Sequence, residues 1–179
     1  MSFIQQCGTI AKKRRRRVQA KDGYLALIVK LLVIITICWL TFTQVFLLMQ
    51  APNNDMFPAI KAGDLTLSYK LQPEYEKDDV VIFEQDGKLR IGRIAALEED
   101  VINIDKTGAY TVNGTPQSGE ILFLTFPESF QDYPYRVKAW EAFILCDYRT
   151  QAEDSREYGP VQLSVIKGKV ISILRRREL

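Results

Sequence analysis

The chain of 179 residues carries one long apolar stretch near its N-terminus, followed by short apolar runs. Residues 31–49 are 19 consecutive uncharged, mostly apolar residues. As a helix rising about 1.5 Å per residue, they span about 28 Å, close to the hydrocarbon thickness of a bilayer. Extended back to residue 23, the stretch includes Lys30, whose amine can reach the basic side of the membrane. The pattern predicts a transmembrane helix over residues 23–49.

Beyond Gln50 the apolar residues occur in short β-rich runs separated by turn residues. Runs at residues 65–69, 80–83 and 88–95 predict strands, and Asp86-Gly87 predicts a tight hairpin between the last two. Further runs lie at residues 101–104 and 109–112, followed by Asn113-Gly114, and at residues 140–145 and 161–174. No long amphipathic helix is predicted. We therefore expect a mostly β fold class, with an antiparallel β domain over residues 50–179.

Charge is distributed unevenly between the two ends. Residues 1–30 contain eight Lys or Arg and one acid, whereas residues 50–179 contain 16 basic and 21 acidic residues, a net charge of 16 − 21 = −5. Basic residues favour the cytoplasmic side of a membrane helix. We therefore expect residues 1–22 to be cytoplasmic and residues 50–179 to be extracytoplasmic, in a single-pass protein of the cell membrane.

The basic run beside the apolar stretch also bears on partners. Next to a membrane helix, such a run is better explained as a topology signal and a contact for anionic lipid than as a nucleic-acid site. We expect membrane lipid as a partner and no nucleic acid. The apolar stretch is longer than in a cleavable secretory signal, and no small-x-small site follows it, so an uncleaved anchor is predicted.

Three segments carry a family resemblance. Residues 53–64 read NNDMFPAIKAGD, residues 89–100 read LRIGRIAALEED, and residues 146–161 read CDYRTQAEDSREYGPV. In order and spacing they resemble the type I signal peptidases of the Gram-positive type, with the patterns x-M-x-P-(T/A)-(L/I)-x-x-G-D, K-R-(V/I)-(V/I)-G-L-P-G-D and G-D-N-R-x-x-S-x-D-S-R-x-x-G-x-V. The resemblance implies a signal peptidase-like β domain with a smaller β insert at about residues 99–139.

The reaction residues of that family are missing here. The resemblance places the attacking serine at Asp55, the general-base lysine at Gly92 and a supporting serine at Ala152. A Ser/Lys dyad needs an unprotonated amine that takes the hydroxyl proton, and Gly92 has none. The carboxylate of Asp55 would oppose the oxyanion that forms beside it. We expect no useful peptidase activity, since losing such groups costs about a millionfold in turnover in a comparable system.

The scaffold positions match the family better than the reaction positions do. The residues expected to hold the fold are Asp147, Arg149, Asp154 and Arg156. The resemblance also implies a peptide groove near the membrane, with candidate residues Asn53, Met56, Phe57, Pro58 and Ile91. Core packing and a rigid turn explain Met56, Phe57 and Pro58 equally well, and Asn53 can cap a turn. Cys146 and Tyr148 are among the departures from the family pattern.

Other catalytic arrangements are less favoured. An aspartic dyad needs two carboxylates that share a proton, and its formal candidates are Asp64, Glu84, Asp147 and Asp154. Lys88 lies about 13 Å along the strand from Gly92, too far to replace the missing base. The chain has no histidine. With the expected topology, Cys7 lies on the cytoplasmic side, Cys38 within the membrane and Cys146 on the outer side. We expect no metal, no cofactor and no intrachain disulfide.

The preferred functional hypothesis is a catalytically inactive, membrane-anchored signal peptidase-like protein that binds exported proteins. In its degenerate pattern the chain resembles the signal peptidase-like accessory proteins of Gram-positive pilus loci. This resemblance implies a chaperone-like accessory role in pilus assembly, with a pilin or a sortase as the partner. The alternative is an active signal peptidase I that cleaves signal peptides with an unconventional site. A third hypothesis is a nonproductive competitor for precursors. The sequence sets neither the client nor the oligomeric state.

Overall fold

The computed structural model describes residues 3–117, 123–130 and 132–175, with side chains from residue 23 onward. The chain divides into two units, Met1–Gln44 and Val45–Leu179, which we describe separately. The first unit is formed by helix α1 (Phe3–Val45). Within α1, Gly23–Val45 has a mean hydropathy of 2.6 and exposes its side chains, so this segment is long and apolar enough to cross a membrane.

The apolar stretch changes from helix to strand earlier than its composition indicates. The helix was expected to continue to Met49, but α1 ends at Val45 and Phe46–Gln50 forms strand β1. The five residues pair antiparallel with strand β2 (Leu65–Tyr69), from Phe46 opposite Tyr69 to Gln50 opposite Leu65. Hydrogen bonding to a distant strand therefore overrides a local apolar pattern that suits either conformation.

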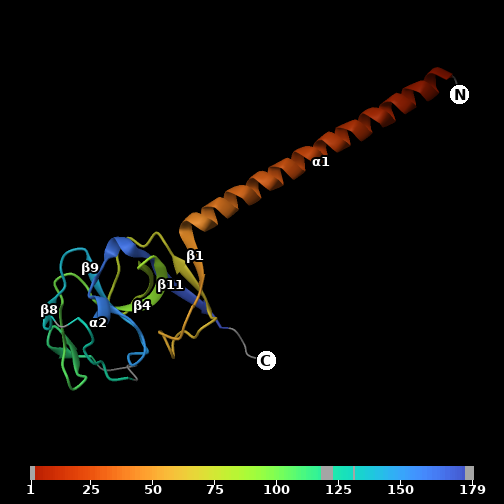
Figure 1. The fold of residues 1–179 in the computed structure, drawn as a ribbon. Coiled ribbons are helices and arrows are strands. Elements are labelled where there is room, and N and C mark those ends of the chain that lie inside the picture. The colour runs from red at the N-terminus through yellow and green to blue at the C-terminus, as the bar shows by residue number, and fades with distance from the viewer. Residues whose placement is uncertain (1–2, 118–122, 131, 176–179) are drawn as a thin grey trace. The chain divides into compact units, whose positions relative to one another are not determined.

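The second unit contains a seven-stranded sheet in the order β1-β2-β11-β3-β4-β9-β10, in which all neighbours are antiparallel. Its other strands are β3 (Val80–Gln85), β4 (Lys88–Ala96), β9 (Glu141–Leu145), β10 (Val161–Gln162) and β11 (Ile166–Leu174). Figure 1 shows β11, from the end of the chain, lying within the sheet between earlier strands. The mostly antiparallel β fold predicted from the sequence is confirmed.

Two tight turns form where the sequence predicts them. Asp86 and Gly87 join β3 to β4 with φ angles of 52° and 72°, and Gln85 pairs with Lys88. Positive φ at both central residues is what a type I′ hairpin requires, and it explains the Asp-Gly pair. Asn113 and Gly114, with φ angles of 52° and 75°, make a second turn of this kind.

A four-stranded sheet lies between β4 and β9 in the sequence, inside the range 99–139 assigned to the insert. Its order is β7-β6-β5-β8, with the strands β5 (Val101–Ile104), β6 (Tyr110–Val112), β7 (Thr115–Pro116) and β8 (Tyr135–Arg136). Ile102 and Val112 from this sheet pack with Phe143 and Leu145 of β9 in one buried cluster. The insert and the main sheet therefore share a core. Two short helices, α2 (Ser155–Tyr158) and the 3₁₀ helix η1 (Leu163–Val165), follow β9.

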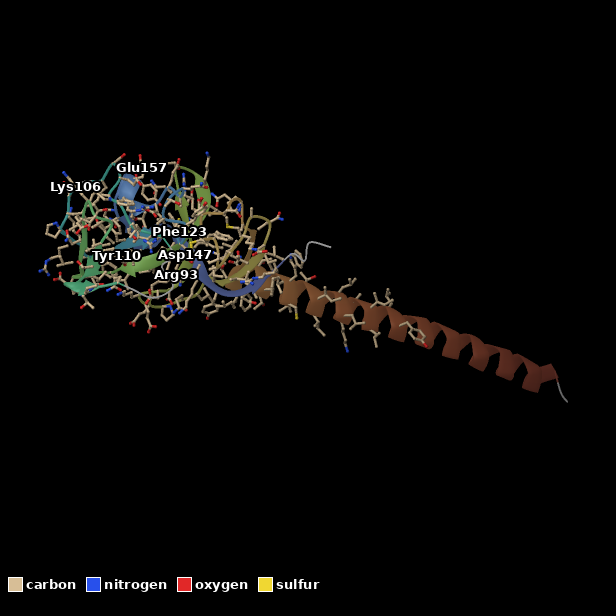
Figure 2. The ribbon with its side chains drawn as sticks, turned by 90° about the horizontal axis from the view of Figure 1, so that it is seen from below. Arg93, Lys106, Tyr110, Phe123, Asp147 and Glu157 are labelled. Carbon is tan, nitrogen blue, oxygen red and sulfur yellow. The ribbon has the colours of Figure 1, made fainter. Side chains whose placement is uncertain are left out.

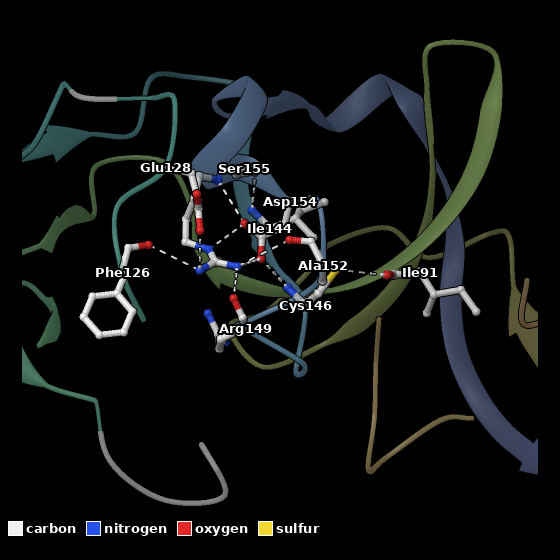
Figure 3. Close-up of polar contacts among 10 residues, drawn as sticks. Ile91, Phe126, Glu128, Ile144, Cys146, Arg149, Ala152, Asp154 and Ser155 are labelled. Atoms are coloured by element: carbon white, nitrogen blue, oxygen red, sulfur yellow. Dashed lines mark hydrogen bonds and ion pairs between the residues drawn. The ribbon is translucent and has the colours of Figure 1, made fainter. Parts of the chain in front are cut away.

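A buried ion pair holds the turn after β9. The Asp154 side chain accepts hydrogen bonds from the backbone N–H groups of Cys146 and Arg156, each at 3.0 Å, and from Arg156 Nε at 2.8 Å. The guanidinium of Arg156 also donates to the carbonyl oxygens of Arg149 at 2.7 Å and Phe126 at 3.3 Å (Figure 3). Both side chains are almost completely buried. The pair therefore connects β9, the turn that follows it and the segment between β7 and β8 of the insert.

Replacing Arg156 by leucine should destabilise this unit strongly, because the Asp154 carboxylate would remain buried without its counter-ion. We expect a loss of about 3–5 kcal/mol in the free energy of unfolding, measured by urea denaturation of the full-length protein in detergent.

Arg136→Leu is the matched control, since Arg136 pairs with Glu99 at 3.0 Å on the surface and both side chains are mostly exposed. We expect this variant to change the free energy of unfolding by about 1 kcal/mol or less. Equal losses for the two variants would contradict the special role assigned to the buried pair.

Candidate functional site

The loop between β1 and β2 carries the first motif and is closed by its own backbone. Ala51 N–H donates to the carbonyl of Asp64 at 2.8 Å, and Gly63 N–H donates to the carbonyl of Ala51 at 2.9 Å. Met56 and Ile60 point from this loop into the core and are 2% and 1% exposed. Two buried apolar anchors thus hold the loop on the sheet, and Asp55 lies half-buried directly before the first of them.

Asp55 is held in place by Asn53 and by Tyr148. Asn53 Nδ2 donates to Asp55 Oδ2 at 2.6 Å, and Asp55 N–H donates to Asn53 Oδ1 at 3.3 Å. The carbonyl of Asp55 accepts the backbone N–H of Tyr148 at 2.8 Å. Asp55 Oδ1 has no hydrogen-bond partner among the described residues. The carboxylate therefore has a defined orientation and one unused acceptor oxygen.

Burial raises the pKa of Asp55 above its ordinary value of 3.8. The hydrogen bond from Asn53 and the charge of Arg90 lower it but do not compensate, and the charges of Glu153 and Asp154 raise it further. Arg90 itself pairs with Glu153 at 2.8 Å. The cation that acts on Asp55 is thus held by another carboxylate, which leaves the charge of Asp55 poorly compensated.

Gly92, which the family resemblance places at the general-base position, has no room for a side chain. A Cβ atom there would lie 2.4 Å from Ile144 Cγ2 and 3.2 Å from Phe83 Cε1. Ile144 is β-branched and fully buried in β9, so its methyl group cannot move aside freely. The position of the base is therefore filled by the packing of β4 against β9.

Ala152 and two of the candidate groove residues belong to one cluster. Met56, Ile91 and Cys146 are buried in it, and Ala152 packs against them. Because Ile91 and Gly92 are neighbours in a strand, they face opposite sides of the sheet, and a side chain at position 92 would point toward the cluster of Phe83 and Ile144 instead.

The remaining groove candidates lie at the surface. Asn53 and Pro58 are exposed, and Phe57 is half-buried with its ring centroid 5.9 Å from that of Tyr148. The five candidates therefore divide into a core pair, Met56 and Ile91, and an outer group on the loop. Tyr148 and Phe123 extend the outer group, because their ring centroids are 4.8 Å apart. Sequence reasoning noted Tyr148 as a departure from the family motif but missed Phe123.

The acidic residues considered for a second dyad are all engaged elsewhere. Asp147 accepts two hydrogen bonds from Arg93, at 3.0 and 2.8 Å (Figure 2). Asp154 pairs with Arg156, Glu84 pairs with Lys167 at 2.8 Å, and Asp64 accepts the N–H of Lys61 at 3.0 Å. None of them shares a hydrogen bond with Asp55 in the described part of the chain. These four acids and Asp55 therefore form no proton-sharing pair.

Neither Lys88 nor Cys146 is placed for catalysis. Lys88 is exposed at the first residue of β4, next to the hairpin. Cys146 is 1% exposed, and burial raises the pKa of its thiol well above the ordinary value, so the thiolate is disfavoured. In the described residues, no group of three or more Cys, Asp or Glu side chains is arranged to hold a metal ion.

Arg149 has the surroundings of a packing residue. It is 5% exposed, its guanidinium carbon lies 5.6 Å from the ring centroid of Tyr110 in β6, and burial lowers its pKa. Its carbonyl accepts a hydrogen bond from Arg156. With Asp147, Asp154 and Arg156, it connects the turn after β9 to both sheets. The scaffold role of these four residues stays a prediction.

The model of the family "Signal peptidase, peptidase S26" matches residues 24–174. The chain belongs to this family.

Known relatives are similar over part of their length. Thylakoidal processing peptidase 1, chloroplastic, of Arabidopsis thaliana is 26% identical over 136 residues, which cover 67% of this chain and 39% of that protein. Probable thylakoidal processing peptidase 2 of the same plant is 27% identical over 133 residues, covering 67% and 35%. The chain thus spans less than half the length of these relatives. A crystal structure of a signal peptidase I from Enterococcus faecalis V583 is 18% identical, with a TM-score of 0.46, covering 55% of this chain and 97% of that one.

The contact at Gly92 leads to a test of packing. Gly92→Ala should lower the free energy of unfolding by about 1–3 kcal/mol, because the added methyl group overlaps Ile144. Combining it with Ile144→Ala should cost less than the sum of the two single changes, as measured by urea denaturation in a double-mutant cycle. Additive costs would show that Ile144 does not occupy the space of the missing side chain.

The raised pKa of Asp55 predicts a pH-dependent gain from Asp55→Asn. Above the raised pKa, the folded state carries a carboxylate that it disfavours, so the neutral amide of the variant should stabilise the protein, on the order of 0.5 kcal/mol after solvent screening. Below the ordinary value of 3.8, both states are protonated and the gain should vanish. Urea denaturation of both proteins across this pH range measures the effect. A variant that is less stable than the wild type near pH 7 would contradict the raised pKa.

Proposed function

We propose that this chain is a catalytically inactive signal peptidase-like protein that binds exported proteins at the membrane. The observation that carries the proposal is the reaction centre: Asp55 replaces the nucleophile, and the space of the base at Gly92 is filled by Ile144. Neither a hydroxyl group nor an amine is available at the two positions that the family mechanism uses.

The chemistry of the replacement argues against a hidden catalytic route. A carboxylate that attacked an amide would form an anhydride and would have to expel an amine, which is a poor leaving group. The charge of Asp55 would also oppose the negative oxygen of the tetrahedral intermediate. Ser155 does not supply a substitute, since it is fully buried and its Oγ accepts the backbone N–H of Ile144 at 3.0 Å.

Membrane attachment is supported by α1 and by one face of the β unit. In strand β2 the polar residues face the core and the apolar residues face outward. Thr66 and Ser68 are fully buried, whereas Leu65, Leu67 and Tyr69 lie on the outer face and are half-buried. The outward row continues with Leu48 of β1 and Leu174 of β11, which are 48% and 60% exposed. A strand with its apolar residues outward suits a surface that meets lipid, so we propose that this face contacts the outer leaflet, with the N-terminus of the chain in the cytoplasm.

The client is proposed to be an exported protein, with a pilin or a sortase as the first candidates. The support for an exported client is the family relationship together with the loop of residues 51–64, whose Asn53 and Pro58 are exposed beside Asp55. The support for a pilus role is the resemblance to degenerate accessory proteins of pilus loci. The peptidase names of the relatives favour the alternative, an active signal peptidase with an unconventional site.

A cleavage assay separates these two functions. Full-length protein in detergent should release no mature product from an Ala-x-Ala precursor above the buffer control, because losing nucleophile and base lowers turnover about a millionfold. Gel electrophoresis of the precursor over time is the measurement. Repeated turnover by the wild-type chain would reject the binding-only function.

The binding function is tested by photo-crosslinking of the full-length protein in membranes of cells that express it. A photoreactive residue in place of Pro58 should capture an exported protein, identified by mass spectrometry, whereas the same residue in place of exposed Thr115 of β7 should not. Capture from neither position would contradict the proposed function.

A further inference from the structure

Two departures from the family motifs meet at one contact. Asp55 stands where the family has a serine, and Tyr148 stands where the family motif has an asparagine. The two residues come from segments about 90 positions apart, yet Tyr148 N–H donates to the carbonyl of Asp55 at 2.8 Å. Together they replace a hydroxyl and an amide by a carboxylate and an aromatic ring.

Aromatic rings form a row that includes Tyr148 and Phe57, which lies two residues after Asp55 in the same loop. The ring centroid of Tyr148 lies 5.9 Å from that of Phe57 and 4.8 Å from that of Phe123. All three side chains are half-buried, so part of each ring remains exposed. A cation already uses the row at one end, where Lys61 Nζ lies 5.8 Å from the ring centroid of Phe57. Aromatic faces attract ammonium groups through the ring quadrupole.

The carboxylate itself is incompletely used. Asp55 Oδ2 accepts from Asn53, and Oδ1 accepts from no described residue. Arg90 lies within electrostatic range but donates to Glu153 at 2.8 Å. A half-buried carboxylate whose Oδ1 accepts from no described residue, and whose neighbouring cation Arg90 pairs with another carboxylate, can take a further cation.

We propose that Asp55 and Tyr148 bind a primary ammonium group of the exported client, with Asp55 Oδ1 as its counter-ion. The ammonium is supplied by a lysine side chain or by a free amino terminus. One open carboxylate oxygen offers a single strong acceptor, which suits the compact charge of an ammonium better than the two-pronged guanidinium of arginine. The inference rests on the proposed function and specifies the chemistry of what is bound.

Short peptides test the ammonium directly on the full-length protein in detergent. The first probe is N-acetyl-Ala-Lys-Ala-amide, the second carries acetyl-lysine, and the third is Ala-Ala-Ala-amide with a free amino terminus. We expect the lysine probe or the free-terminus probe to bind at least about tenfold more tightly than the acetyl-lysine probe, measured by calorimetric titration. The stronger of the two identifies the source of the ammonium. Equal binding by all three probes would overturn the proposal.

Variants assign the binding to this site. Asp55→Asn should weaken binding of the preferred probe about tenfold, and Tyr148→Asn should weaken it several-fold. Glu98→Gln removes one exposed negative charge from a distant turn and should leave the affinity unchanged. If Glu98→Gln weakens binding as much as Asp55→Asn, the attraction is only the general charge of the domain, and the proposal fails.

The crosslinking assay separates this inference from the proposed function. If Asp55→Asn still captures the client from position 58 at the wild-type level, the ammonium site is rejected and the binding function stands. If the wild-type chain captures no client, the binding function itself is rejected, whatever the peptides do. Loss of capture in Asp55→Asn with normal folding supports both.

Discussion

The buried pair of Asp154 and Arg156 is the interaction on which the site depends. Asp154 accepts the N–H of Cys146 at the end of β9, and Arg156 donates to the carbonyl of Arg149, so the intervening turn is fixed at both ends. That turn presents the N–H of Tyr148 to the carbonyl of Asp55. A charge pair far from solvent thus sets the position of a residue on another loop. Because such a pair is costly to break, the turn keeps the N–H of Tyr148 in place for this hydrogen bond.

In the proposed function, the family scaffold is kept while the packing beside Gly92 leaves no room for the side chain of a base. The loss at Gly92 is more than the absence of an amine, since Ile144 has taken up the space beside its backbone. Ile144 belongs to a cluster with Phe83 and Ile94, so the change is built into the core of the sheet. A lysine at position 92 would have to displace close-packed side chains before it could act as a base.

Local sequence patterns predicted most of the fold. The features that they missed depend on contacts between residues far apart in the sequence. The hairpin at Asp86-Gly87 follows from two residues that tolerate positive φ. The conversion of residues 46–50 to a strand depends on pairing with residues 65–69, which no local pattern shows. The reaction positions followed from the family resemblance, but the pair of Arg90 with Glu153 joins residues 63 apart, and only the folded chain brings them together.

One residue, Asp55, accounts both for the inactivity that we propose and for the ligand that we infer. A negative charge at position 55 disfavours the oxyanion of acyl transfer and favours a cation for the same electrostatic reason. Its half-buried location strengthens both effects, because fewer water molecules screen the charge. The same burial raises the pKa of Asp55, which means that the folded state disfavours the charged form of this carboxyl group. A binding role accounts for this arrangement, since functional sites commonly retain groups that reduce stability.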